Sequence, residues 1–117
     1  MGDTTMIIIA FAPNSSKLLP NIFCKHFRHC AVLFRKKNKF IMLQFVSRKH
    51  IEQIELQQRD ITLLTSHGWR FIYIPCEMPH EFNPHNAWSC VDMAKRAINI
   101  KSVTIQTPYG LYKKLSE

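Results

Sequence analysis

Residues 29–46 read HCAVLFRKKNKFIMLQFV. Two runs within this stretch, 29–34 and 39–46, are rich in apolar, β-branched and aromatic residues. A short polar turn at 36–39 separates the two runs. Strand-like runs joined by such a turn are typical of a β-hairpin. We therefore predict two antiparallel strands that pair with each other.

Three further strands are predicted on either side of this hairpin, at residues 4–12, 51–56 and 69–74. The first is apolar and rich in β-branched residues, as expected for a strand that is buried on both faces. The second alternates apolar and polar residues, which is the pattern of a half-buried strand. The third ends at Pro75, which cannot donate a hydrogen bond to a sheet.

Helix signals are concentrated in the second half of the chain. Helices are predicted at 16–23, at 60–67 closed by Gly68, at 90–98, and from Thr107 onward. Ser89 and Asp92 have the spacing of a capping box at the start of the helix at 90–98. Thr107 suits an N-cap, and Pro108 takes the favoured first helical position. The segment 76–87 is predicted to be a loop because it holds prolines, histidines and asparagines.

Length and composition fit a single domain. The chain has 117 residues, of which 46% are hydrophobic, enough for one core. Because the strands cluster and the stronger helices follow them, we predict one α+β domain over residues 1–117. In it, a small antiparallel β-sheet packs with the helix at 90–98 and with a C-terminal helix.

Segments that direct a chain to or through a membrane are not apparent. No apolar run reaches the roughly 18 residues that a transmembrane helix needs. The apolar stretch 6–12 has no basic segment before it and no small-residue cleavage site after it, so we expect no signal peptide. The four cysteines form no C-x-x-C pair, and we expect them to be reduced in a cytoplasmic compartment.

The chain is strongly basic, with a formal net charge of +8 and a pI near 9.6. Its Lys and Arg residues form small clusters at 35–39, 48–49 and 113–114, where turns and a helix end are predicted. Aromatic residues do not interleave with these clusters, as they do in proteins that bind single-stranded nucleic acid. We therefore predict a solvated basic surface and no specific nucleic-acid partner.

Three residues are candidates for chemistry. If Ser89 caps its helix, Cys90 lies in the first turn, where unpaired N–H groups and the helix dipole stabilise a thiolate and can donate to an oxyanion. His29, at the start of its predicted strand, is the candidate base. Gln44 is a polar residue in an apolar strand, and it is a candidate for orienting the His29 ring.

Other interpretations of these residues remain open. A cysteine at a helix start is more often a packing residue than a nucleophile, and Gln44 is equally consistent with an outward-facing edge position. A zinc site is the next alternative, with the candidate ligands Cys24, His26, His29 and Cys30, or Cys76, His80, His85 and Cys90. Because neither spacing fits a common zinc module, we predict no metal ion and no cofactor.

Two segments carry a resemblance to a known group. The segment FCKHFRHCAVLF at 23–34, followed by a hairpin and by FIMLQF at 40–45, resembles the His-bearing strands of circularly permuted papain-like proteins. That group includes the YiiX-like and lecithin retinol acyltransferase-like branches of the NlpC superfamily. The segment NAWSCVDMAKRAINIKSVTIQTPYGLYKKL at 86–115 resembles the nucleophile helix and tail of its small phage and bacterial members.

The resemblance implies a permuted papain-like thiol hydrolase or acyltransferase, with the His strand before the Cys helix. It makes Cys90 the nucleophile and His29 the base, and it puts Gln44 in the third, orienting position. The implied substrates are amide or ester acyl groups in peptides, cell-wall peptides or lipids. A neutral amide stabilises an imidazolium less than a carboxylate does, which leaves a second interpretation open. This is a non-catalytic structural or binding module, for example a virion-associated protein or a phage assembly component.

Overall fold

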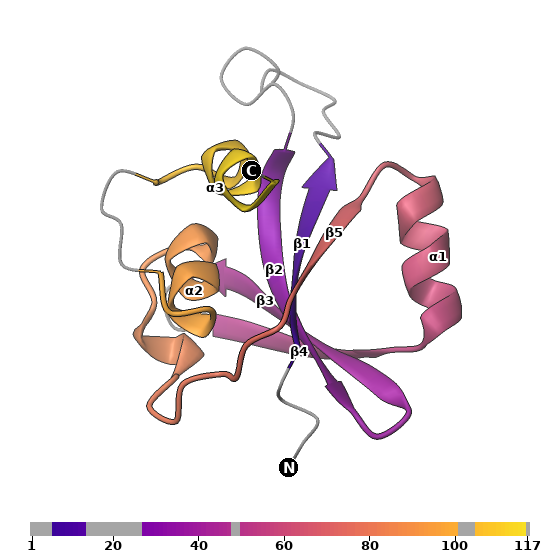
Figure 1. The fold of residues 1–117 in the computed structure, drawn as a ribbon, viewed down its shortest axis with the longest axis horizontal. Helices are drawn as coiled ribbons and strands as arrows, with labels where there is room; N and C mark the ends of the chain where they lie inside the picture. The colour runs from indigo at the N-terminus through magenta and orange to yellow at the C-terminus, as the bar shows by residue number, and fades with distance from the viewer. Residues whose placement is uncertain (1–5, 14–26, 48–49, 101–104, 117) are drawn as a thin grey trace.

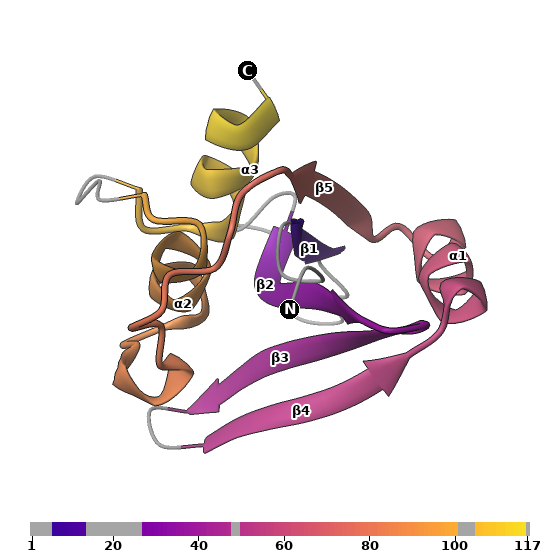
Figure 2. The same ribbon diagram turned by 60° about the horizontal axis from the view of Figure 1, so that its bottom comes forward.

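The chain folds into one antiparallel sheet with helices on both of its faces. The computed structural model describes residues 6–13, 27–47, 50–100 and 105–116. Its elements are β1 (Ile7–Pro13), β2 (Phe27–Lys36), β3 (Lys39–Ser47), β4 (His50–Leu56), α1 (Gln58–Ser66), β5 (Arg70–Ile74), the 3-10 turn η3 (Pro84–Asn86), α2 (Cys90–Ala97) and α3 (Pro108–Ser116). Figures 1 and 2 show α1 on one side of the sheet and α2 with α3 on the other. The predicted α+β class with an antiparallel sheet is therefore confirmed.

The sheet has the strand order β4-β3-β2-β1-β5, and every neighbouring pair is antiparallel. Strand β1 lies between β2 and β5, and its residues 7–11 are buried on both faces, as their unbroken apolar sequence predicts. The predicted hairpin joins β2 to β3, with Lys36 paired with Lys39. Lys37 has φ 59°, the left-handed conformation that a two-residue hairpin turn requires.

Two apolar clusters, one on each face of the sheet, hold the elements together. The cluster on the α2 face combines alternate residues of β1 and β2, such as Phe11 and Cys30, with Val91 and Met93 of α2 and Leu111 of α3. The cluster on the α1 face, which includes Leu33 and Met42, packs under α1 through Ile61. The residues that alternate along β2 thus divide between the two clusters, as the period of a strand dictates.

The predicted helix starts match the structure at α2 and α3 and differ at α1. Thr107 Oγ1 accepts a hydrogen bond from Gly110 N at 2.9 Å, which makes Thr107 the N-cap of α3. Helix α1 begins at Gln58 rather than at residue 60, because the Asp60 carboxylate accepts from Gln57 N at 2.8 Å and extends the first turn. Gly68, with φ 99°, follows the last turn of α1 as predicted.

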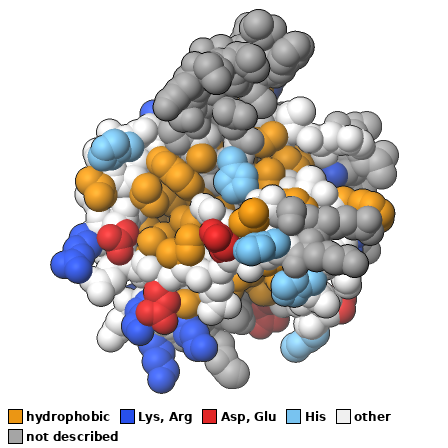
Figure 3. Space-filling model, turned by 180° about the vertical axis from the view of Figure 1, so that it is seen from behind, with side chains coloured by type: hydrophobic (Ala, Val, Ile, Leu, Met, Phe, Trp, Pro, Cys, Tyr) orange, Lys and Arg blue, Asp and Glu red, His pale blue; other side chains and the backbone are white. Residues whose placement is uncertain are grey.

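Some sequence predictions fall on other parts of the chain or concern its surface. The predicted helix at 16–23 and the start of the first strand at 4–5 lie outside the described residues. The basic cluster at 35–39 includes Arg35, Lys36, Lys37 and Lys39, which are all exposed. Figure 3 shows Lys and Arg side chains gathered at the corner where the β2–β3 hairpin turns. None of the helices in the described part of the chain is both long and apolar enough to cross a bilayer.

Candidate thiol site at the start of helix α2

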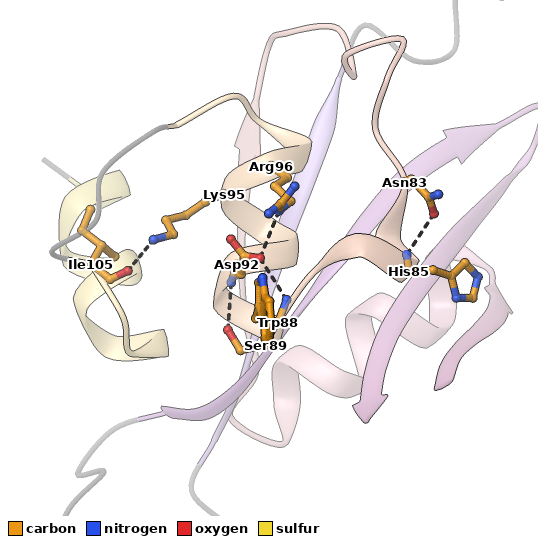
Figure 4. A network of polar contacts seen from close by, with 8 residues as sticks. All are labelled: Asn83, His85, Trp88, Ser89, Asp92, Lys95, Arg96 and Ile105. Carbon is orange, nitrogen blue, oxygen red and sulfur yellow. Dashed lines mark hydrogen bonds and ion pairs between the residues drawn. The ribbon is translucent and has the colours of Figure 1, made fainter. Parts of the chain in front are cut away.

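Side-chain hydrogen bonds fix the start of α2. Ser89 Oγ accepts from Asp92 N at 3.1 Å, which makes Ser89 the N-cap. The Asp92 carboxylate accepts from Trp88 N at 2.9 Å and from Arg96 Nε at 3.0 Å (Figure 4). The return bond therefore goes to Trp88, one residue before the position that a capping box would use. Cys90 is the first residue of the helix that these contacts hold in place.

The opposite end of α2 is tied to the segment before α3. Lys95 Nζ donates to the carbonyl oxygen of Ile105 at 2.7 Å (Figure 4). The buried face of α2 packs against the sheet through Val91, Met93, Ala94 and Ala97. Cys90 is half-buried and packs against the same cluster, to which Cys30 of β2 belongs.

Interactions with two consecutive residues of β2, His29 and Cys30, determine the pKa of the Cys90 side chain. The structure therefore brings together two of the three predicted site residues, Cys90 and His29. It also adds Cys30, whose side chain is fully buried. As a thiolate, Cys90 can accept a hydrogen bond from each of these two residues.

Consecutive strand residues normally point to opposite faces, so the approach of both His29 and Cys30 to one sulfur needs a local cause. Ala12 pairs with His29 and Pro13 with Phe27, so the β1–β2 register shifts directly beside His29. Such a bulge increases the local twist and redirects side chains. We attribute the position of His29 to this irregularity.

The contacts around Cys90 change its acidity. The pKa of Cys90 is lowered to about 4, chiefly by the hydrogen bond from Cys30 and, against the opposing effect of burial, also by the hydrogen bond from His29. The pKa of Cys30 is raised by its hydrogen bond to Cys90, by burial and by the charge on Cys90. Of the two thiols, Cys90 is therefore the one that ionises, while Cys30 keeps its proton and donates it.

The third predicted site residue, Gln44, lies elsewhere. Its Nε2 donates to the sulfur of Met42 at 3.6 Å, and Met42 packs in the cluster on the α1 face. Cys90 packs on the α2 face. By simple alternation His29 would share the α1 face with Ala31 and Leu33, but the register shift lies directly beside it. The structure thus does not bring Gln44 together with Cys90.

A pocket of about 770 Å³ adjoins the start of α2. Its lining includes Ser89, Asp92 and Lys95 of the outer side of α2 and its cap, together with Phe82 and Trp88 from the preceding loop. The volume falls in the range of about 300–1,000 Å³ that is typical of ligand sites. Trp88 is 63% exposed, so its indole ring offers an apolar surface one residue before the cap of α2.

In the described part of the chain, no group of three or more His, Cys, Asp or Glu side chains has an arrangement that could hold a metal ion. In particular, Cys76, His80, His85 and Cys90 do not gather. Of the other group considered, Cys24 and His26 lie outside the described residues.

Comparison with known proteins does not place the chain in a family. No family model, no curated protein and no solved structure matches it. Its chemistry has to be argued from the site itself.

Cys30 is the site residue that sequence reasoning missed. The sequence predicts it only as a candidate zinc ligand, since the catalytic interpretation rests on its neighbour His29. One signal for it was present: Cys30 and Val32 alternate with Ala31 and Leu33, so Cys30 belongs to a single face of the strand. What the alternation does not reveal is that α2 packs on that face.

Proposed function

We propose that this chain is a cysteine hydrolase or acyltransferase that acts on an amide or ester bond. The observation that carries the proposal is the contact of Cys90, at the capped start of α2, with His29 of β2. A nucleophilic thiol needs a lowered pKa and a nearby base, and both conditions meet at Cys90. Most buried cysteines have neither.

In this reaction the Cys90 thiolate attacks the acyl carbonyl carbon, and the carbonyl oxygen becomes an oxyanion. Asp92 N–H is engaged by Ser89 Oγ and Met93 N–H by the Ser89 carbonyl. We therefore assign the oxyanion to the N–H groups of Cys90 and Val91, at the positive end of the helix.

His29 takes the proton that Cys90 loses when the thiolate forms. Collapse of the tetrahedral intermediate then expels an amine or alcohol, to which His29 donates this proton, and leaves a thioester on Cys90. His29 then removes a proton from water or from a second acceptor, which attacks the thioester. This step releases the acyl group and restores the Cys90 thiolate. The Cys30 thiol stabilises that thiolate throughout by its hydrogen bond.

The finer proposal for the fold is a permuted papain-like domain. Its support is the order of the parts: a histidine on a strand of an antiparallel sheet comes first, and the cysteine at a helix start follows. In such an arrangement the sheet supplies the base and the helix supplies the nucleophile and the oxyanion donors. The order of the elements suits the resemblance found in the sequence, which by itself proves no activity.

The pocket beside Ser89 is our candidate for the substrate side of the reaction. It adjoins the helix turn that carries Cys90 and combines the exposed Trp88 with the charged groups of Asp92 and Lys95. Cys90 and His29 are not among the residues that line it, so we assign to this pocket only the peptide or lipid portion of an acyl donor, and not the reacting carbonyl. We propose peptides, cell-wall peptides and lipid esters as the classes to test first.

The test is acylation of the reduced protein by p-nitrophenyl acetate and by peptide thioesters, followed by mass spectrometry of proteolytic fragments. We expect an acyl group on Cys90 that is absent from Cys90→Ala and strongly reduced in His29→Ala. Cys76→Ala is the matched control, because Cys76 is also half-buried but has a pKa that burial raises. If folded protein takes no acyl group from any donor, the chain is a binding or structural module instead.

A further inference from the structure

A second thiol lies against the proposed nucleophile, and acyl transfer does not require it to react. Cys30 is fully buried on β2, in the cluster against which the half-buried Cys90 of α2 packs, and the two thiols interact. Both cysteines are reduced in the structure. Two thiols that interact within one cluster, one of them reachable from solvent, form a pair of the kind that oxidises within one molecule.

We propose that Cys30 and Cys90 form a reversible disulfide, which makes this pair an oxidative modification site that switches the thiol site off. The oxidant would be a hydroperoxide such as hydrogen peroxide. The proposal does not depend on hydrolase activity, because the disulfide can form whether or not Cys90 ever carries an acyl group.

The packing of the two elements favours such a bond. Strand β2 is central in the sheet, and α2 packs on it through the cluster that contains Cys30. The Ser89 cap keeps Cys90 at the end of α2 that meets His29 and Cys30. A disulfide brings the two sulfurs to about 2.0 Å, so the Cys30 and Cys90 side chains must turn toward each other within this cluster.

The chemistry begins at Cys90. Its thiolate attacks one oxygen of the peroxide, the O–O bond breaks, and the departing hydroxide takes a proton to become water. Cys90 is now a sulfenic acid. The Cys30 sulfur attacks the Cys90 sulfur and loses its own proton, and the S–OH bond breaks to release a second water. In total, one peroxide is reduced to two waters while two thiols become one disulfide.

The order of these two steps follows from the electrostatics of the pair. Burial and the negative charge on Cys90 raise the pKa of Cys30, so Cys30 is a poor nucleophile in the reduced protein. Conversion of Cys90 to a neutral sulfenic acid removes that charge and lets the Cys30 thiol ionise more easily. Cys30 therefore acts as the resolving thiol, and a dithiol reductant reverses the bond by exchange.

The experiment uses the full chain carrying Cys24→Ser, with limited hydrogen peroxide, iodoacetamide to block the remaining thiols, and peptide mapping. We expect a disulfide-linked peptide pair that joins Cys30 to Cys90, together with loss of iodoacetamide labelling at Cys90. Dithiothreitol should restore that labelling. Cys76→Ser serves as the matched control and should give the same linked pair.

The Cys30→Ala variant separates the two steps. Without a resolving thiol, Cys90 should accumulate as a sulfenic acid that dimedone traps, and it should pass to sulfinic acid at higher peroxide. Cys30→Val serves as a second variant if alanine destabilises the core. A persistent Cys90 sulfenic acid in protein that retains Cys30, or a disulfide from Cys90 to Cys76, would overturn the proposal. Neither result bears on acylation, which is measured separately on reduced protein.

Discussion

The side chains of His29 and Cys90 meet between the first residues of β2 and the first residue of α2, although they come from different halves of the chain. Two local features make this contact. The β1–β2 register shifts directly beside His29, where a bulge can redirect a side chain, and the Ser89 cap fixes the position of Cys90. The contact between His29 and Cys90 therefore depends on both the strand irregularity and the helix cap.

The reactivity of Cys90 should depend on pH differently from that of an ordinary thiol. Since the thiolate is the reactive form and the pKa of Cys90 is lowered to about 4, its alkylation rate should stay nearly constant between roughly pH 5 and 8. Cys76 should instead react faster as the pH rises through that range, because burial raises its pKa. Iodoacetamide labelling resolved by peptide mapping measures both rates. A rate at Cys90 that climbs tenfold per pH unit would contradict the assignment.

The two partners of Cys90 should contribute unequally to its acidity. The hydrogen bond from Cys30 lowers the pKa of Cys90 more than the hydrogen bond from His29 does. Cys30→Ala should therefore move the midpoint of Cys90 alkylation to higher pH by more than His29→Ala moves it. Acylation should show the opposite order, because only His29 can transfer a proton to the leaving group. If Cys30→Ala and His29→Ala had equal effects in both assays, the separate roles assigned to Cys30 and His29 would be wrong.

Substitution of Gln44 should have little effect on the chemistry. Its amide donates to Met42 on the α1 face, away from Cys90, so Gln44→Ala should leave the rates of Cys90 alkylation and acylation within about twofold of the parent. His29→Ala is the positive control in the same assays. If Gln44→Ala lowers acylation as strongly as His29→Ala does, the two side chains are coupled across the sheet.

Most of the fold was predictable because local patterns determine it. The apolar run of β1, the hairpin turn near Lys37 and the N-caps Ser89 and Thr107 each follow from short stretches of sequence. The face of His29 was not predictable, since it depends on a register shift that pairs residues 12–13 with residues 27–29. The role of Cys30 depends on which face of the sheet α2 covers, and no local pattern encodes that choice.

The cap of α2 should contribute to both stability and reactivity. Ser89→Ala removes the oxygen that accepts from Asp92 N, which should lower the free energy of unfolding by about 1 kcal/mol. Without the cap, the start of α2 should also fray, and fewer N–H groups would then point toward the Cys90 sulfur. Alkylation of Cys90 at pH 6 should therefore slow. Ser66→Ala is the matched control, because that serine is exposed at the end of α1, and its hydroxyl contacts only local groups, the Leu63 carbonyl at 2.6 Å and His67 Nδ1 at 3.4 Å. Urea denaturation and labelling rates measure the two effects.

The closing helix α3 should be necessary for the stability of the domain. Leu111 is fully buried in the cluster on the α2 face, and the rings of Phe11 and Tyr112 pack edge to face with centroids 5.2 Å apart. Leu111→Ala should lower the free energy of unfolding by about 2–5 kcal/mol through lost burial and a residual cavity. Lys114→Ala, on the exposed side of α3, should change it by less than about 0.5 kcal/mol. Both variants are compared by urea denaturation, and equal midpoints would show that α3 is peripheral to the core. Cys90 packs in the same cluster as Leu111. In Leu111→Ala, the labelling rates of Cys90 and Cys76 should therefore become more alike as the urea concentration approaches the midpoint of unfolding.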